Sequence, residues 1–211
     1  MSAEYTTAQI IQLPQANRQR NIQVVRQVKG AVDNRMNYLF DGLLLNVADA
    51  LFEEMHGMDQ HRQIDEHFNI TRALKVRGDV YQEEFLTLMN LSWVNLIKSK
   101  NYQALPDAPC EVAPTLTYYS ERNLNHYKIL LEEIRLRFTA LVDTDVDFHP
   151  LLPNNFYLCF WHATEKLGIN YSERVLLLPL FNRFVMDRFG QVLSIANQGL
   201  VEFGIKIHER S

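Results

Sequence analysis

The chain has 211 residues, of which 47% are hydrophobic and 22% are charged, so it is long enough to bury one sizeable core. Its 21 Lys and Arg residues are outnumbered by 25 Asp and Glu residues, and the formal net charge of -4 argues against a protein that binds nucleic acid by bulk electrostatic attraction. The two cysteines, Cys110 and Cys159, are too few and too far apart for a disulfide framework or a complete cysteine metal site, which favours a reducing, cytoplasmic setting.

The sequence predicts neither a secretory leader nor a membrane span. Residues 1–14 do not place an apolar stretch after a basic one, as a signal peptide does. The longest apolar stretch, residues 175–181, falls far short of the roughly 20 residues that cross a bilayer. Arg174 and Arg183 flank this stretch, so we expect it to belong to a protein core.

The first half of the chain has a helical pattern. Residues 1–16 are polar and are predicted to form a mobile tail, whereas residues 17–100 are predicted to form an N-terminal helical block. Asp33 is a suitable N-cap, and from there apolar residues recur at spacings of three and four until Gly57, where we expect that helix to end.

Two further periodic stretches complete the N-terminal block. They cover residues 64–74 and 80–97, and Gly78 is predicted to separate them into two helices. Residues 101–117 contain three prolines and are predicted to be a linker or a long ordered loop. The rest of the chain, residues 118–211, is predicted to form a C-terminal helical block.

The C-terminal block begins with apolar residues that step by three and four from Leu124 to Leu141. This spacing predicts a heptad-like seam on an antiparallel helix of a bundle. Pro153 suits the first turn of the next helix, and Gly168 is predicted to end it. The last helix is predicted over residues 173–203.

Pro179 interrupts that last helix, which therefore either kinks there or consists of two helices in series. Apolar residues cover most of its circumference, so we expect it at the centre of the protein or at a dimer seam. No segment shows the sustained alternation of a strand. The predicted fold is an all-α bundle of about six or seven helices with a long C-terminal helix, in which both blocks pack as one domain.

Glu53 and His56 have the Glu-x-x-His spacing that places both side chains on one helix face in di-iron bundles. Such a site needs a second copy of the motif and two further glutamates, and the nearby His61 and Asp65 do not supply them. We favour solvated polar helix faces here and predict no metal or other cofactor, with a metal-dependent enzyme as a third hypothesis.

Cys159 and His162 invite a nucleophile hypothesis, but neighbouring helical residues point about 100° apart and a buried structural cysteine is the favoured interpretation. All eight glycines are isolated, so neither a phosphate-binding loop nor a dinucleotide fingerprint is present. The nucleophile elbow and the zinc-protease motif are also absent. We therefore predict no catalytic residues.

Positive charge gathers near the start of the chain, where the first forty residues contain five basic residues and two acidic ones. We call the basic residues Arg18, Arg20, Arg26, Lys29 and Arg35 the basic arm. Arg18, Arg20, Arg26 and Lys29 are candidate contacts for an acidic partner, a nucleotide phosphate or an anionic surface. The alternative is a solvated helix flank without a special role.

Several short motifs follow one another along the chain: ALFE at residues 50–53, ALKVR at 73–77, HPLLP at 149–153 and LFNRFV at 180–185. Over residues 38–205 this order resembles a bacterial family of unknown function, some members of which carry an automatic label of thymidine phosphorylase. The resemblance implies an all-helical fold, no catalytic residues to transfer, and a chain that corresponds to the N-terminal part or to a short relative of longer proteins. The sequence does not support the label, because a nucleoside phosphorylase needs a phosphate site and an α/β framework.

These observations favour a non-enzymatic interaction or regulatory module that presents helical surfaces to a protein partner or to a second copy of itself. The alternative is a helical domain in which a pocket near Trp161 accepts a nucleotide or another anion with help from the basic arm. The other residues expected around that pocket are Phe156, Tyr157 and Phe160. We expect no nucleic-acid partner.

Overall fold

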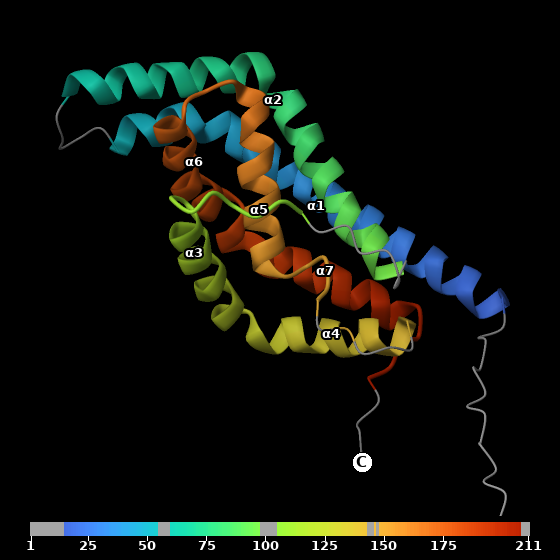
Figure 1. Ribbon diagram of the computed structural model, residues 1–211. Coiled ribbons are helices and arrows are strands. Elements are labelled where there is room, and N and C mark those ends of the chain that lie inside the picture. Colours follow the sequence, from blue (N-terminus) through green and yellow to red (C-terminus); the bar gives the residue numbers. More distant parts are fainter. Residues whose placement is uncertain (1–14, 55–59, 98–104, 143–145, 147, 208–211) are drawn as a thin grey trace, which may run out of the picture.

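The computed structural model describes residues 15–54, 60–97, 105–142, 146 and 148–207 (Figure 1). Within these ranges the chain forms seven α-helices and two short 3-10 helices, joined by turns and loops, so the all-α prediction is confirmed. None of the described helices is both long and apolar enough to cross a membrane.

Two long helices pack against each other along one side of the molecule (Figure 1). Helix α1 spans Gln15–Glu54 and contains 40 residues, and helix α2 spans Gln60–Ile97 and contains 38. Isolated helices gain little stability in water, so the length of this pair reflects the apolar faces that both helices bury. The helices within residues 153–202 pack against the inner side of the pair, and those within residues 113–142 pack on them in turn (Figure 1).

The helix boundaries predicted inside this pair are wrong. Asp33 lies in the middle of α1, where its carboxylate pairs with the ammonium group of Lys29 one turn earlier. Helix α2 continues through Gly78, where an added Cβ would lie 3.3 Å from two methyl carbons of Leu44. Close packing of α1 on α2 therefore outweighs the helix propensity of glycine, which is about 1 kcal/mol below that of alanine. The stop predicted at Gly57 lies outside the described residues.

Helices α3 (Ala113–His126) and α4 (Lys128–Val142) follow the proline-containing segment. Helix α3 starts inside residues 101–117, and Pro114 occupies its first turn, where no N–H is needed. Tyr127 separates the two helices, so the heptad-like pattern from Leu124 to Leu141 is not one helix.

Tyr127 anchors this break to the end of the chain. Its hydroxyl donates to the carbonyl oxygen of Met186 at 3.2 Å, and its ring packs edge-on against Phe189. The residues of α4 that the pattern placed on one face are nevertheless buried, namely Leu131, Ile134, Phe138 and Leu141.

Helix α5 (Pro153–Ala163) starts at the predicted proline and continues as the 3-10 helix η1 (Thr164–Leu167). Gly168 follows with a φ of 69°, in the left-handed region that glycine adopts at little cost. The predicted stop at Gly168 is therefore confirmed, although the last turn before it has 3-10 geometry.

Helix α6 (Tyr171–Phe184), the 3-10 helix η2 (Met186–Arg188) and helix α7 (Phe189–Glu202) form one long segment bent by 19°. Helix α6 runs through Pro179 without ending, so the interruption predicted at Pro179 is wrong, and the segment divides into two helices at η2 instead. The carbonyls that end α6 are satisfied by Arg188, whose Nη1 donates to the oxygens of Arg183 at 3.2 Å and Phe184 at 3.1 Å.

One apolar core joins the two halves of the chain. At its centre lie four fully buried rings from four helices, Phe40 of α1, Phe85 of α2, Phe160 of α5 and Phe181 of α6. Phe181 stacks on Phe160 with ring centroids 4.1 Å apart, and Phe40 contacts Phe85 at 4.6 Å and Phe181 at 6.1 Å. Aromatic contacts of this kind add to the free energy gained by burial.

We expect Phe181→Ala to lower the free energy of unfolding by about 3–5 kcal/mol, because it empties a site that four other rings, including that of Tyr157, surround. Urea denaturation followed by circular dichroism measures this change. Ile129→Ala is the control, since Ile129 is 80% exposed and its truncation should change stability by less than about 0.5 kcal/mol. Equal effects of the two substitutions would contradict the assignment of Phe181 to the centre of the core.

Candidate functional site

The basic arm lies on α1, and the structure divides it. Arg18 and Arg26 are exposed, whereas Lys29 pairs with Asp33. At about 100° per residue, Arg20 lies on the opposite side of α1 from Arg18, and its Nη2 donates to the carbonyl oxygen of Phe203 at 3.1 Å. The arm is therefore not one continuous patch, and three of its members already have partners within the chain, because Arg35 also donates to Gln191 Oε1.

The sequence motifs considered for metal binding and nucleophilic chemistry have other surroundings. Glu53 pairs with Arg183, whose guanidinium nitrogens lie 3.2 Å from Oε2, and His56 lies outside the described residues. In the described ranges no three His, Cys, Asp or Glu side chains are grouped as a metal site would require. Cys159 is buried, as predicted, and burial raises the pKa of its thiol.

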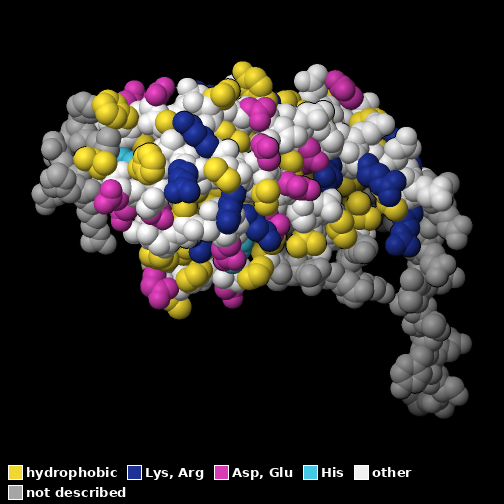
Figure 2. Space-filling model, turned by 90° about the horizontal axis from the view of Figure 1, so that it is seen from above, with side chains coloured by type: hydrophobic (Ala, Val, Ile, Leu, Met, Phe, Trp, Pro, Cys, Tyr) yellow, Lys and Arg dark blue, Asp and Glu magenta, His cyan; other side chains and the backbone are white. Residues whose placement is uncertain are grey.

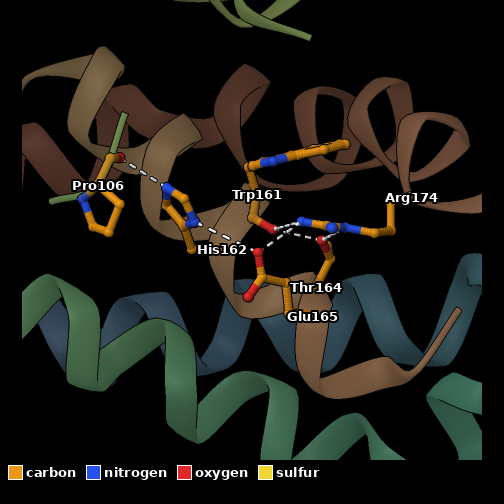
Figure 3. Close-up of polar contacts among 6 residues, drawn as sticks. All are labelled: Pro106, Trp161, His162, Thr164, Glu165 and Arg174. Atoms are coloured by element: carbon orange, nitrogen blue, oxygen red, sulfur yellow. Dashed lines mark hydrogen bonds and ion pairs between the residues drawn. The ribbon is translucent and has the colours of Figure 1, made fainter. Parts of the chain in front are cut away.

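A polar cluster that was not predicted from the sequence joins α5, η1 and α6 (Figure 3). The guanidinium carbon of Arg174 lies 4.1 Å from the ring centroid of Trp161, and Nη2 donates to the carbonyl oxygen of Trp161 at 2.8 Å. Nε donates to Thr164 Oγ1 at 2.8 Å, and Glu165 Oε1 lies 3.5 Å from Nη2. Arg174 thus satisfies carbonyl and hydroxyl groups at the end of α5.

His162 lies beside this cluster and contacts the loop that precedes α3 (Figure 3). Its Nε2 is 2.8 Å from the carbonyl oxygen of Pro106, and its Nδ1 is 3.8 Å from Glu165 Oε1. These partners fix the imidazole between a loop and η1. We interpret the cluster as a structural clasp, because the side chains of Arg174, Thr164 and His162 bond to backbone or side-chain groups of the chain. The buried indole Nε1 of Trp161 has no hydrogen-bond partner among the described residues.

The aromatic residues expected around a ligand pocket belong to the core. Phe156, Tyr157, Phe160 and Trp161 are fully buried. The hollows found in the described part of the chain lie elsewhere, and none of the four residues lines them.

One hollow of about 550 Å³ lies between α2 and the turn that leads into α6. Arg72 and Arg77 line it, and Arg77 is held in place by a 3.4 Å contact from Nη1 to the carbonyl oxygen of Lys166. The bare α-carbon of Gly168 makes room for this arginine, since an added Cβ would lie 2.7 Å from Nη1. The remaining lining residues are Asn69, Ala73, Val76, Leu167, Ile169, Asn170 and Glu173.

A second feature is an exposed apolar stripe on the outer face of α1. Tyr38, Leu45 and Phe52 are 64%, 80% and 60% exposed, and they follow one another at intervals of seven residues. This spacing returns to the same face of a helix every two turns. Phe52 belongs to the apolar residues that recur between Asp33 and Gly57, and the prediction that these form one buried helix face is wrong for Phe52. Tyr38 and Leu45 were not predicted as candidate residues. Their seven-residue interval was the signal that could have shown the stripe.

A hollow of about 490 Å³ lies along this stripe, between α1 and the end of α6. Its floor includes Gly42, and nothing lies within 4 Å of the position that a Cβ would occupy there. The other lining residues are Tyr38, Leu39, Asp41, Leu45, Asn46, Phe184 and Arg188. We call this hollow, together with Tyr38, Leu45 and Phe52, the α1 surface.

The face of the molecule shown in Figure 2 has a mixed character. On that face, seen from the side of α2, hydrophobic side chains are scattered among acidic and basic ones. Helix α2 does expose apolar residues, namely Ile64, Phe68, Val76 and Val80. Charged neighbours such as Arg72 and Lys75 separate them, and the hollow next to them is the polar one described above.

Residues 20–204 match the family model described as protein of unknown function (DUF1631) N-terminal domain. The match extends from α1 to the end of α7, so it includes both long helices, the clasp and the α1 surface. No curated protein and no solved structure matches the chain. The resemblance to a family of unknown function is therefore confirmed.

We expect Arg174→Met to lower the free energy of unfolding by about 1.5–3 kcal/mol, because it leaves the carbonyl of Trp161 and the hydroxyl of Thr164 without their charged donor. Thermal and urea unfolding measure the change. Arg72→Met is the matched control, since no described group bonds to Arg72 and the substitution should be nearly neutral. A neutral Arg174→Met would show that the clasp does not stabilise the fold.

Proposed function

We propose that this chain, which belongs to the DUF1631 N-terminal domain family, is a non-enzymatic interaction module that binds a protein partner through the α1 surface. The observation that carries the proposal is the stripe of large, exposed apolar side chains at heptad spacing. Partner helices recognise such spacing because an i, i+7 row of side chains stays in register with an adjacent helix. Regulation by such a partner is compatible with the absence of a catalytic motif from the sequence.

The shape and the apolar character of the α1 surface also suit a docking site. Its hollow supplies concave apolar surface, and Tyr38 and Leu45 stand at its edges. Tyr38 further holds the Arg35 guanidinium at 4.7 Å from its ring centroid, which restricts the ring before any partner arrives. A pre-formed aromatic anchor next to a hollow is typical of the residues that dominate binding energy at interfaces.

The basic arm is a second proposed contact, and it rests on Arg18 and Arg26. Both are exposed and have no bonded partner among the described residues. Arg20 and Lys29 would first have to release Phe203 and Asp33, respectively. The arm would therefore add long-range attraction for an acidic partner rather than the main contact.

A small-anion function is the second candidate, and the hollow lined by Arg72 and Arg77 favours it. We expect pyrophosphate to raise the melting temperature saturably, because a ligand that binds only the native state stabilises it. Arg72→Met should abolish the shift, whereas Lys75→Met, which removes an exposed charge of α2 outside the hollow, should preserve it. Equal shifts for both variants would assign the effect to general screening and contradict this candidate.

For the interaction module, we expect affinity capture from lysate of the source organism to retain a protein that binds the wild-type chain and is lost with Leu45→Asp. The aspartate places a charge where the partner must bury an apolar group. Mass spectrometry identifies the retained proteins, and sedimentation of the purified chain tests whether a second copy is the partner.

Ile129→Asp is the matched control for this experiment. Ile129 is 80% exposed, as Leu45 is, but it lies on α4 away from the hollow. Thermal unfolding of both variants establishes that they fold. If Leu45→Asp and Ile129→Asp retain the same proteins as the wild type, the α1 surface is not the binding site.

A further inference from the structure

The hollow of the α1 surface is lined by Gly42, and contacts within the chain do not explain why a glycine occupies this position. Gly42 lies inside α1, where glycine is less favourable than alanine. A methyl group added there would meet no atom within 4 Å, so packing inside the chain does not require glycine at this position. At Gly78, by contrast, the close approach of Leu44 supplies such a reason.

The surroundings of Gly42 explain what its missing side chain leaves open. Tyr38 and Leu45 lie on either side of it along α1, and Phe184 and Arg188 close the hollow from the end of α6. A large side chain from outside would therefore meet apolar neighbours around the α-carbon of Gly42, whose carbonyl already accepts a hydrogen bond from Asn46 Nδ2 at 2.7 Å. This is the arrangement of a hole that receives a knob from another helix.

Two carboxylates flank the stripe. Asp41 and Asp49 lie four residues before and after Leu45, within about 40° of it around α1, and both are exposed with no bonded partner among the described residues. The cations nearby keep their charge but contact other groups of the chain, since Arg188 donates to backbone carbonyls and Arg35 stacks on Tyr38. Arg183 is paired with Glu53. A ligand surface that lies along α1 here meets two free carboxylates.

We infer that the partner of the α1 surface is an amphipathic α-helix of another protein, which inserts a large apolar side chain over Gly42 and places Lys or Arg residues against Asp41 and Asp49. This inference rests on the proposed function and specifies its partner. On such a partner helix, apolar residues at heptad spacing would pack against the stripe, and basic residues beside them would pair with the two carboxylates.

A second copy of this chain is a poorer occupant for reasons of charge. In an antiparallel pairing centred on Leu45, residue i faces residue 90 − i, so Asp41 of each copy would face Asp49 of the other. In a parallel pairing in register, each aspartate would face its own equivalent. Like charges placed opposite each other across an interface disfavour both arrangements.

The test uses two three-heptad helical peptides as probes, each with Leu at every seventh position on an alanine background. One carries Lys beside the leucines and the other carries Glu. We expect the full chain to bind the Lys peptide at least about tenfold more tightly than the Glu peptide in fluorescence anisotropy titrations at low salt. The double variant Asp41→Lys, Asp49→Lys should reverse this preference.

Gly42→Ala separates binding from stability. It should raise the melting temperature by about 2–4 °C, because alanine is the better helix former, and should weaken the Lys peptide about tenfold by filling the hole. Gly30→Ala is the matched control, since Gly30 also lies in α1 with nothing within 4 Å of its Cβ position. It should raise the melting temperature similarly and leave binding unchanged.

Three outcomes would overturn the inference: equal affinity for both peptides, no detectable binding of the Lys peptide, or wild-type affinity in Gly42→Ala. None of them would by itself refute the proposed function. If Leu45→Asp still abolishes capture of a partner, the α1 surface is a docking site whose partner has another chemistry. If Leu45→Asp retains the partner as well, both proposals fail.

Discussion

Stacking of Phe181 on Phe160, with Phe40 and Phe85 against them, is the contact on which the rest of the structure depends. These rings come from helices that are far apart in the sequence, and their burial fixes how the long pair α1 and α2 meets the C-terminal half. Because a large aromatic ring can be buried from only a few directions, the cluster sets the rotation of each helix about its own axis. Once α1 is fixed with Phe40 inward, the orientation of its other residues follows.

The α1 surface is a consequence of that rotation. Phe40, Leu43 and Val47 point into the core, which leaves Tyr38 and Leu45 on the outside of the same helix. A single apolar face would have sufficed to hold α1 in place, so the outer apolar residues are not needed for the fold. Large exposed apolar areas tend to mark interaction sites because they are otherwise a cost in solubility. The stripe is thus better explained by binding than by folding.

Helix periodicity was enough to predict the fold class and much of the core, because burial of an apolar face follows directly from the spacing of its residues. It could not predict boundaries that depend on distant contacts. Gly78 stays helical because Leu44 packs on it, and Tyr127 breaks a regular pattern while bonding to Met186. The clasp of Arg174 on Trp161 is equally invisible in the sequence, since it needs α5 and α6 to be placed first. The candidate site was missed for a related reason. The apolar residues of α1 were interpreted as core, because the sequence does not show how much of the circumference of that helix is buried.

The rigidity of the surface bears on how it would bind. Helix α1 is held along its length by α2, α6 and α7, and the joint beside the hollow is fixed by Arg188 and Tyr127. A partner that meets a surface already in its final shape does not have to order this chain, so the entropy cost of association falls mainly on the partner. A partner segment that becomes helical only on binding would lose conformational entropy, and burial of its apolar side chains in the hollow would offset that loss. The two free aspartates would speed the encounter and, at low salt, favour a basic partner over an acidic one.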